Sequence, residues 1–334
     1  LRDTLIDSSS FSLPHPFDSI GQSVASTISF ELDEALKTSI ELNSLRNNAF
    51  MELQHKFNRL SINSGIRTSY WDLNEEFLFS PRMSVSYRPY WDRDILFRFS
   101  TGVYYQAPFY RELRDFDGNV NRDIKSQKSI HFVIGSDYNF KIWQRPFKLV
   151  TELYYKDLED LIPYEVENVR IRYYATNNTV GYATGFDARL NGEFIKGVDS
   201  WVSLSILKTE ADIIGDTYID DDGNTQEIGY YRRPTDQRFN FSLFFQDYLP
   251  KNPNFKMHLN LVYGSRIPLT APGTYKGQYD FTLPDYKRVD IGFSAILKKE
   301  GKELGRFNPF KYTKSAWVSL EVFNLLDIDN TISY

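Results

Sequence analysis

Apolar and polar residues alternate with a period of two along most of this 334-residue chain. The clearest example is residues 80–106, where Met83, Val85 and Tyr87 share one face and arginines and serines share the other. A turn at residues 89–94 divides this stretch into two alternating halves. Side chains alternate between two faces only in a β-strand. The pattern therefore predicts a hairpin of two strands, each about ten residues long.

The same alternation recurs along the chain and predicts about twelve or thirteen long strands. They are expected at residues 49–57, 62–71, 80–88, 95–106, 130–141, 148–156, 185–194, 202–206, 238–246, 257–266, 288–297 and 318–322. Strands of a soluble sandwich usually run about five or six residues. Strands of about ten residues with one apolar and one charged face are typical of a transmembrane antiparallel β-barrel, in which lipid surrounds the apolar face and the lumen is wet.

The composition agrees with strands that cross a membrane. Aromatic residues make up 16% of the chain, yet its mean hydropathy is −0.45. No apolar run approaches the roughly eighteen residues of a membrane helix, because polar neighbours cancel apolar ones in any window of an alternating strand. We expect lipid to contact the large apolar side chains of the alternating stretches, among them Phe186, Leu190, Phe239, Phe241, Ile291 and Phe293.

The composition also excludes several classes of site. Cysteine is absent, which excludes a disulfide framework, a thiolate metal site and a cysteine nucleophile. The net charge of −5 argues against a general nucleic-acid binder. Residues 1–10 lack the pattern of a signal peptide, so we expect a mature chain or a part of a longer one. Residues 1–25 are polar and aperiodic, and we expect them to form a loop that leads into a barrel domain at residues 26–334.

The predicted connections differ in length between the two ends of the strands. Short turns are expected near Asn58, Trp91, Gln144, Gly197 and Asn252. Long loops are expected between Gln106 and Ser129, Asp157 and Tyr182, Thr209 and Arg238, and Arg266 and Lys287. Two connections depart from this rule, since the one at 74–76 is short and the one at 300–314 is long. Short turns at one rim and long extracellular loops at the other are typical of outer-membrane barrels.

Four segments resemble successive barrel segments of TonB-dependent outer-membrane receptors, and most closely the large receptors of Bacteroidetes-type bacteria. They are residues 43–57 (NSLRNNAFMELQHKF), 64–89 (SGIRTSYWDLNEEFLFSPRMSVSYRP), 101–114 (TGVYYQAPFYRELR) and 318–330 (VSLEVFNLLDIDN). The last segment resembles the penultimate barrel strand of that family, with Asn324-Leu325-Leu326-Asp327 where Asn-Leu-Phe-Asp is common.

The resemblance implies a bacterial outer-membrane receptor with a barrel of about 22 strands and an N-terminal plug, importing scarce nutrients with energy from TonB. With its twelve or thirteen strands, this chain is expected to be part of such a barrel, incomplete at both ends and without the plug domain and the last strand. The implied partners are outer-membrane lipid and lipopolysaccharide, TonB through the missing N-terminal region, a surface lipoprotein, and a small-molecule, glycan or peptide substrate. The alternative is a passive porin-like or surface-binding barrel without TonB coupling.

Two groups of residues are candidates for contacts inside and above such a barrel. Charged residues on the polar faces are expected to line the lumen, where they pair across strands, hold the plug or touch substrate: Arg82, Arg88, Arg98, Asp137, Arg189, Glu193 and Arg238. Substrate contacts are expected mainly from aromatic and arginine residues of the long loops: Phe109, Tyr110, Arg111, Tyr173, Tyr230 and Arg232. Such residues suit flat organic or sugar ligands, although packing of the loops against each other would also explain them.

No catalytic site and no cofactor are expected. Ser129 and His131 lie two residues apart, like the catalytic pair of outer-membrane phospholipases, but on the face expected to line the lumen. The acidic runs Asp115–Asn119 and Asp220–Asn224 could bind calcium weakly, although neither fits an EF-hand frame. Their Asp-Gly and Gly-Asn pairs also favour simple turns. The histidines are dispersed at positions 15, 55, 131 and 258, which argues against a local metal site.

Overall fold

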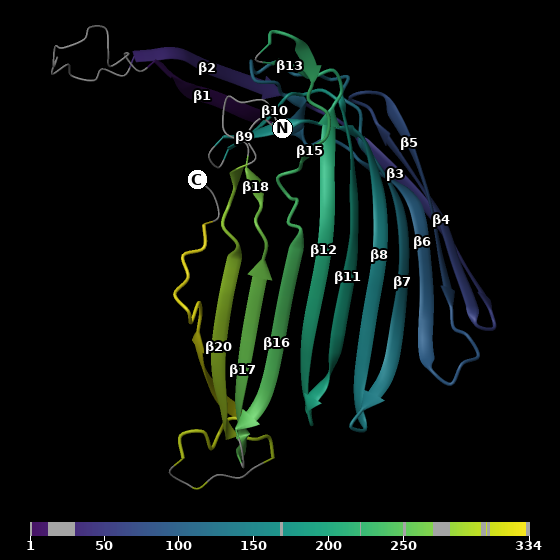
Figure 1. The fold of residues 1–334 in the computed structure, drawn as a ribbon, viewed down its shortest axis with the longest axis vertical. Coiled ribbons are helices and arrows are strands. Elements are labelled where there is room, and N and C mark those ends of the chain that lie inside the picture. Colours follow the sequence, from purple (N-terminus) through teal and green to yellow (C-terminus); the bar gives the residue numbers. More distant parts are fainter. Residues whose placement is uncertain are drawn as a thin grey trace, which may run out of the picture.

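The computed structural model describes residues 2–12, 31–167, 170–220, 222–249, 252–269, 281–301, 305 and 308–331. Within these residues the fold is almost entirely antiparallel β-sheet, with one short 3-10 helix, η1 (Tyr110–Leu113). No helix in this part of the chain is long and apolar enough to cross a membrane. The main body is a curved sheet whose long strands follow one another in chain order (Figure 1).

Twelve long strands form this sheet, in the number and order that the alternation predicts. They are β3 (Arg46–Phe57), β4 (Leu60–Trp71), β5 (Glu76–Tyr87), β6 (Asp94–Gln106), β7 (Gln127–Ile142), β8 (Arg145–Leu161), β11 (Thr179–Ile195), β12 (Val198–Ile213), β16 (Phe239–Leu249), β17 (Asn252–Gly264), β20 (Tyr286–Lys298) and β21 (Ala316–Val322). Several are longer than predicted, reaching 17 residues in β8 and β11, because backbone pairing continues past the apolar stretch into polar residues. Among the described strands β3 and β21 each pair on one side only, so the sheet is open.

The register of the strands places apolar residues opposite apolar residues and polar residues opposite polar or small ones. One row of directly paired residues is apolar over eight strands: Ile62, Val85, Phe99, Ile134, Leu153, Phe186, Ile206 and Phe239. The adjacent row, shifted by one residue, is polar or small over the same strands: Ser61, Ser86, Arg98, Gly135, Glu152, Asp187, Ser205 and Asn240. The sheet therefore has one apolar face and one polar face, as the alternation predicts.

The apolar face is not packed into a protein core. Ile134, Leu153 and Ile206 are 60%, 58% and 47% exposed in the isolated chain. The six side chains expected to face lipid all lie on this face, and none of them is buried. A soluble sandwich would hide such residues between two sheets, whereas a barrel wall leaves them for lipid.

The connections match the predicted division between short and long. Two-residue turns join β3 to β4, β7 to β8 and β11 to β12, and Asn58, Gln144 and Gly197 adopt the positive φ angles that tight turns require, at 51°, 62° and 81°. The long connections at the other rim contain small strands that the alternation did not predict. These are β9 (Tyr164–Glu167), β10 (Arg170–Tyr173), β13 (Thr217–Ile219), β14 (Thr225–Glu227), β15 (Tyr231–Arg232), β18 (Pro268–Leu269) and β19 (Phe281–Thr282).

The prediction of a loop at the N-terminus is partly wrong. Residues 2–12 form strand β1 (Arg2–Ser12), which pairs antiparallel with β2 (Glu31–Glu41) in a separate hairpin. The sequence of this segment is polar and does not alternate regularly, so the alternation did not predict a strand there. Pairing with β2 supplies the backbone hydrogen bonds of β1. The rest of the predicted loop, residues 13–25, lies outside the described residues, as does residue 1.

Candidate functional site

The long connections at one rim fold together over a small hydrophobic core. Its buried members come from the segment before β3, from the β6–β7 and β8–β11 connections and from the end of β4: Leu42, Trp71, Leu113, Ile124, Ile162, Tyr173 and Ala175. Leu113 and Ile124 are 0% and 1% exposed, which makes them the most deeply buried large apolar side chains in the described chain. The core therefore holds the loops as a fixed roof above this end of the sheet.

Partly buried and exposed polar contacts also fasten the same roof to the strands. The Glu76 carboxylate of β5 accepts hydrogen bonds from Ser126 N at 3.0 Å and from Ser126 Oγ at 2.5 Å. Asn177 Nδ2 donates to Asp160 O at 2.8 Å, and its Oδ1 accepts from Lys125 N at 2.8 Å. These contacts satisfy backbone groups that would otherwise be left unpaired inside the roof.

A cavity of about 310 Å³ lies beneath this roof. We call it the rim pocket, and it is lined by Gln106, Glu112, Gln127, Leu161, Ile162, Pro163, Tyr164, Ile171, Tyr173, Thr179, Ala211, Tyr231, Arg233 and Pro234. Gln106, Gln127, Thr179 and Ala211 are each separated by an even number of positions from the polar row on their own strands. The rim pocket therefore opens on the polar face of the sheet.

The rim pocket combines several phenols with one carboxyl and one guanidinium. Glu112 is 6% exposed, and one of its oxygens accepts the Phe109 N–H at 2.8 Å at the start of η1. Burial raises the pKa of Glu112 above its ordinary value of 4.5. Burial likewise raises the pKa values of Tyr173 and Tyr231, so both phenols remain protonated donors.

The structure brings three of the predicted loop residues together at the edge of the rim pocket. The Arg111 guanidinium carbon lies 5.7 Å from the ring centre of Tyr173 and 5.8 Å from that of Phe109. Tyr173 itself lines the rim pocket. Tyr110 turns to the neighbouring connection, where its hydroxyl forms a 2.7 Å hydrogen bond with Ser44 Oγ.

Tyr230 and Arg232 lie elsewhere, and their chain neighbours Tyr231 and Arg233 line the rim pocket instead. The reason is the pairing of β15 with β12, in which Tyr231 stands opposite Ala211 and Arg232 opposite Glu210. Since Ala211 belongs to the polar face, Tyr231 is directed to that face and the residues beside it to the other. Tyr230 accordingly lies beside Tyr182, with ring centres 5.8 Å apart.

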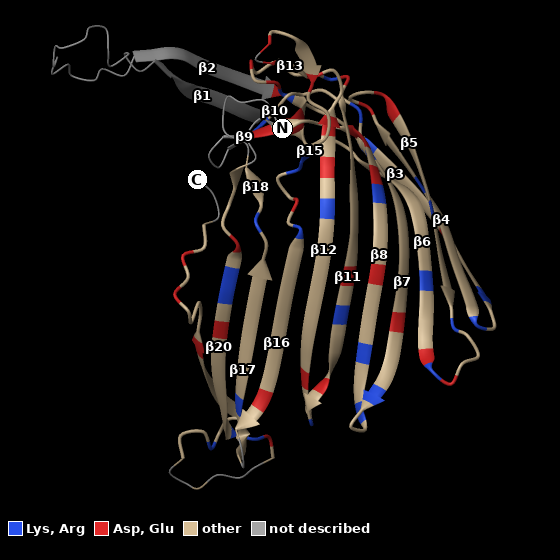
Figure 2. Ribbon diagram, viewed as in Figure 1, with Lys and Arg blue, Asp and Glu red and all other residues tan. Residues whose placement is uncertain are grey.

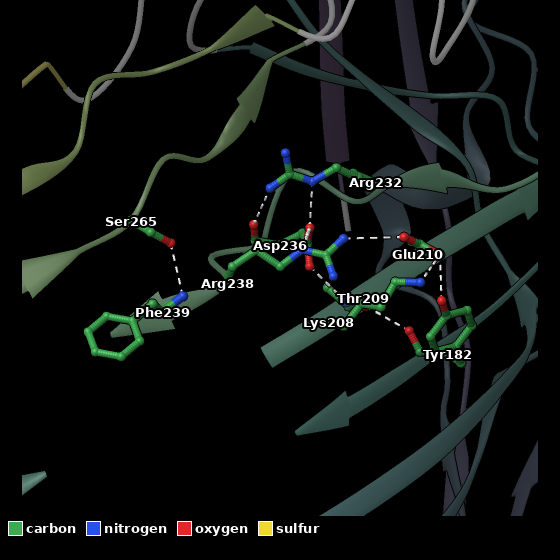
Figure 3. Close-up of polar contacts among 9 residues, drawn as sticks. All are labelled: Tyr182, Lys208, Thr209, Glu210, Arg232, Asp236, Arg238, Phe239 and Ser265. Atoms are coloured by element: carbon green, nitrogen blue, oxygen red, sulfur yellow. Dashed lines mark hydrogen bonds and ion pairs between the residues drawn. The ribbon is translucent and has the colours of Figure 1, made fainter. Parts of the chain in front are cut away.

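Arg232 and Arg238 are held by one buried carboxylate, that of Asp236 (Figure 3). Asp236 is 0% exposed, and its Oδ2 lies 2.6 Å from Arg232 Nε and 2.8 Å from Arg238 Nε. Arg238 Nη2 also pairs with Glu210 Oε1 at 3.2 Å, and Glu210 Oε2 pairs with Lys208 Nζ at 2.9 Å. This network, the Asp236 cluster, fixes residues 231–238 against β12.

A second network lies on the polar face at mid-sheet, where acidic and basic residues alternate across β6, β7 and β8 (Figure 2). Arg98 Nη2 lies 2.8 Å from Asp137 Oδ1 and 2.9 Å from Glu152 Oε1. Lys148 Nζ lies 2.7 Å from the other Asp137 oxygen. Two of the seven residues expected to line the lumen, Arg98 and Asp137, therefore pair across strands, which is one of the roles expected for them.

The other residues expected to line the lumen have local contacts. The Arg82 guanidinium lies 5.2 Å from the ring centre of Tyr104, and that of Arg189 lies 4.8 Å from the ring centre of Trp201. Arg88 Nη1 pairs with Asp94 Oδ1 at 2.9 Å, and Glu193 Oε2 accepts the Gly197 N–H at 3.2 Å. Arg238 belongs to the Asp236 cluster.

The remaining candidates from the sequence have simple structural contacts in the part of the chain that the structure describes. His131 stacks on Tyr104 with ring centres 4.3 Å apart on the polar face. Asp115 and Asp220 each accept a backbone N–H of their own turn, from Asn119 at 2.8 Å and from Asn224 at 2.7 Å, which supports the turn interpretation. Among the described residues no group of three or more His, Cys, Asp or Glu could hold a metal ion. Two wider hollows, of about 720 and 670 Å³, lie near the short turns.

Comparisons with solved structures show the fold. The chain is similar to the copper transporter OprC (TM-score 0.61, 15% identity), covering 91% of this chain and 45% of that one. It is similar to the outer membrane transporter YddB from Escherichia coli (TM-score 0.60, 14% identity, 89% and 43% covered). It is also similar to a mutant of the ferric enterobactin receptor of Pseudomonas aeruginosa (TM-score 0.58, 12% identity, 89% and 41% covered).

The chain thus spans less than half the length of these solved proteins. No curated protein sequence matches it. The family model described as "TonB dependent receptor-like, beta-barrel" matches residues 10–325, which is nearly the whole chain. The chain therefore belongs to the TonB-dependent receptor-like β-barrel family.

Proposed function

We propose that this chain forms part of an outer-membrane receptor that binds a nutrient at the long-loop rim and imports it with energy derived from TonB. The observation that carries the proposal is the position of the rim pocket. It opens on the polar face, beneath a roof of packed loops and above the paired charges of Arg98, Asp137 and Glu152. A solute held there would lie at the mouth of a polar lumen, with lipid on the opposite face of the same strands.

The family supports an outer-membrane position and a transport role. Its members are bacterial outer-membrane barrels, and the similar solved proteins include a copper transporter and a ferric enterobactin receptor. The apolar row from Ile62 to Phe239 gives this chain a continuous surface for lipid, as a barrel wall requires. The family is one of receptors and transporters, and we propose that this chain has no catalytic activity.

The partners follow from this role. The lumenal charges suit a plug domain or a hydrated solute, because charges on a barrel interior need either a partner or water. We therefore include in the proposal a plug and a TonB contact supplied by other parts of the protein. Outer-membrane lipid and lipopolysaccharide would contact the apolar face, and a surface lipoprotein could cover the long loops. Weak calcium binding by the turns Asp115–Asn119 and Asp220–Asn224 remains a proposal.

Nutrient depletion in the native bacterium tests the transport role. Wild-type cells, cells without this receptor and cells without TonB are grown in one defined nutrient mixture, and depletion of each component is followed by mass spectrometry. We expect at least one nutrient to be depleted by wild-type cells alone. A nutrient whose depletion needs the receptor but not TonB would instead identify a passive barrel. Equal depletion of every nutrient by all three strains would contradict the proposed function.

A further inference from the structure

We propose that the rim pocket recognises a single sugar ring that carries a carboxylate, such as a uronic acid or a terminal uronate of a larger molecule. This inference rests on the proposed function, since it names the chemical class that the receptor would bind. It is carried by three features of the rim pocket: its size, an arginine without a carboxylate partner, and buried polar groups beside tyrosine rings.

The size of the rim pocket favours a small ligand. Its volume of about 310 Å³ lies at the lower end of the range for small-molecule sites, roughly 300–1,000 Å³. Tyr164 and Tyr173 meet at a ring-centre distance of 6.0 Å and a tilt of 54°, forming an angled aromatic wall. A sugar ring presents C–H groups on its faces and hydroxyls around its edge. Such a ring can place a face on a tyrosine and its hydroxyls on the polar lining.

Arg233 supplies the positive charge. Three arginines lie within seven positions of the chain, and Asp236 pairs with Arg232 and Arg238. Arg233 lines the rim pocket, and none of the described carboxylates forms an ion pair with it. A guanidinium presents parallel N–H donors that match the two oxygens of a carboxylate. The structure thus leaves one guanidinium available to an anion in the rim pocket.

The remaining polar lining fits hydroxyl groups. Thr179 is 2% exposed, and its Oγ1 is buried without a hydrogen-bond partner in the described part of the chain. Gln106 and Gln127 add side-chain amides, each of which both donates and accepts. Glu112 also lines the rim pocket, and one of its oxygens accepts the Phe109 N–H. A buried hydroxyl such as that of Thr179 costs free energy unless a ligand or water completes its hydrogen bonds.

Other ligand classes fit the rim pocket less well. A divalent cation needs several oxygen ligands of negative charge, whereas Glu112 is the single carboxylate in the lining and Arg233 would repel the ion. A neutral sugar would use the tyrosines and amides but would leave Arg233 without an anion. A simple carboxylate such as acetate would pair with Arg233 but would leave Thr179 and the glutamines unused.

Calorimetry on the intact receptor in detergent tests the inference with three probes: glucuronate, glucose and acetate. We expect glucuronate to bind at least about tenfold more tightly than either of the other two, because it alone satisfies both the guanidinium and the hydroxyl-binding groups. Arg233→Gln should weaken glucuronate binding by about tenfold to a hundredfold, which is the range for loss of a charged hydrogen bond. Arg233→Lys, which keeps the charge but not the two parallel donors, should give an intermediate loss.

Arg122→Gln is the matched control, since Arg122 is exposed on the long loop outside the rim pocket. It removes the same charge and should leave glucuronate binding unchanged. Thermal unfolding of each variant shows whether it is folded. If Arg233→Gln does not fold, the binding measured for Arg233→Lys decides the test. Glucuronate that binds no more tightly than glucose, or equally well to all the folded variants, would overturn the inference. If the receptor imports another nutrient with TonB but does not bind glucuronate, the inference is wrong and the proposed function is still supported. If the receptor binds glucuronate but imports no nutrient with TonB, the ligand assigned to the rim pocket is supported and the proposed function is wrong.

Discussion

The carboxylate of Asp236 lies 2.6 Å from Nε of Arg232, four residues earlier in the chain. The same carboxylate pairs with Arg238 at 2.8 Å and accepts the Thr209 N–H at 2.8 Å. It is fully buried, at 0% exposure. One side chain therefore fastens both ends of the segment 232–238 to β12, and the position of Arg233 in the rim pocket depends on it.

Asp236→Asn should loosen this segment. Asparagine can still accept the Thr209 N–H, but Arg232 and Arg238 lose the negative charge between them. Breaking a buried ion pair on one side costs roughly 3–5 kcal/mol, and we expect about 3 kcal/mol because both guanidiniums keep some contact with water. Proteolytic cleavage within residues 231–238 should become about a hundredfold faster. Asp222→Asn, at an exposed turn, is the control, and equal cleavage of the two variants would show that Asp236 does not hold the segment.

Arginine substitutions should distinguish the two faces of one strand. Leu190 lies on the apolar face of β11, in register with Leu149 and Val202, whereas Asn191 lies on the polar face. Leu190→Arg should destabilise the receptor in bilayers by about 2–4 kcal/mol, as for arginine near the membrane midplane, and Ile291→Arg should do the same. Asn191→Arg should cost much less. Urea titration of the receptor refolded into vesicles measures all three, and equal penalties would contradict the assignment of faces.

Gly185 lies where a side chain would collide with the neighbouring strands. A Cβ atom at this position would lie 2.5 Å from the backbone oxygen of Ile206 and in contact with the Tyr154 hydroxyl. Gly185→Ala must therefore move the backbone of β11 or β12, and we expect a loss of about 1–3 kcal/mol in the free energy of unfolding. Gly305→Ala meets no atom within 4 Å and should change stability little. A Gly185→Ala variant as stable as Gly305→Ala would show that the strands do not approach this closely.

The buried carboxyl of Glu112 should make the loop roof sensitive to pH. Its pKa is raised in the folded roof, so the folded roof holds the proton more tightly than the opened one. The contribution to stability is fully present below the ordinary pKa of 4.5 and is lost as pH rises through the raised value. Hydrogen exchange at the Phe109 and Leu113 amides, corrected for intrinsic rates, should therefore show more frequent opening at pH 7 than at pH 4.

Glu112→Gln should remove this dependence, because glutamine can still accept the Phe109 N–H but carries no proton to lose. Glu75→Gln, at an exposed position of the β4–β5 turn, is the control and should keep the pH response of the unmodified roof. If the opening of the roof depends on pH equally in both variants, a group other than Glu112 causes the effect.

The alternation with a period of two predicted the membrane-spanning strands, because successive residues of such a strand face lipid and the polar interior in turn. Each long strand has lipid on one side and a polar interior on the other, so its sequence must alternate over its whole length. The β7 stretch from Ile130 to Phe140 shows this, and its partners Phe99 and Leu153 continue the same face. The open edges at β3 and β21 agree with the expectation of an incomplete barrel.

The rim could not be predicted in the same way, because no repeating environment fixes its register. Tyr230 and Arg232 were expected at the site, whereas the pairing of β15 with β12 directs Tyr231 to the polar face. A shift of one residue exchanges the faces of a strand. The pairing of β15 with β12 joins residues about 20 positions apart in the chain, such as Ala211 and Tyr231, and it determines which tyrosine and which arginine reach the rim pocket. The Bacteroidetes-type origin inferred from the four segments stays a prediction.

Single-cysteine scanning along β11 and β12 tests the two-faced wall most directly, since this chain contains no cysteine of its own. Cysteines are placed one at a time at Phe186, Asp187, Leu204 and Ser205 in the receptor in lipid vesicles, carrying a fluorescent label that is quenched from either phase. Labels at Phe186 and Leu204 should be quenched by a lipid-dissolved quencher, and labels at Asp187 and Ser205 by a water-soluble one. The same quenching at all four positions, or the opposite alternation, would contradict the barrel wall on which the account rests.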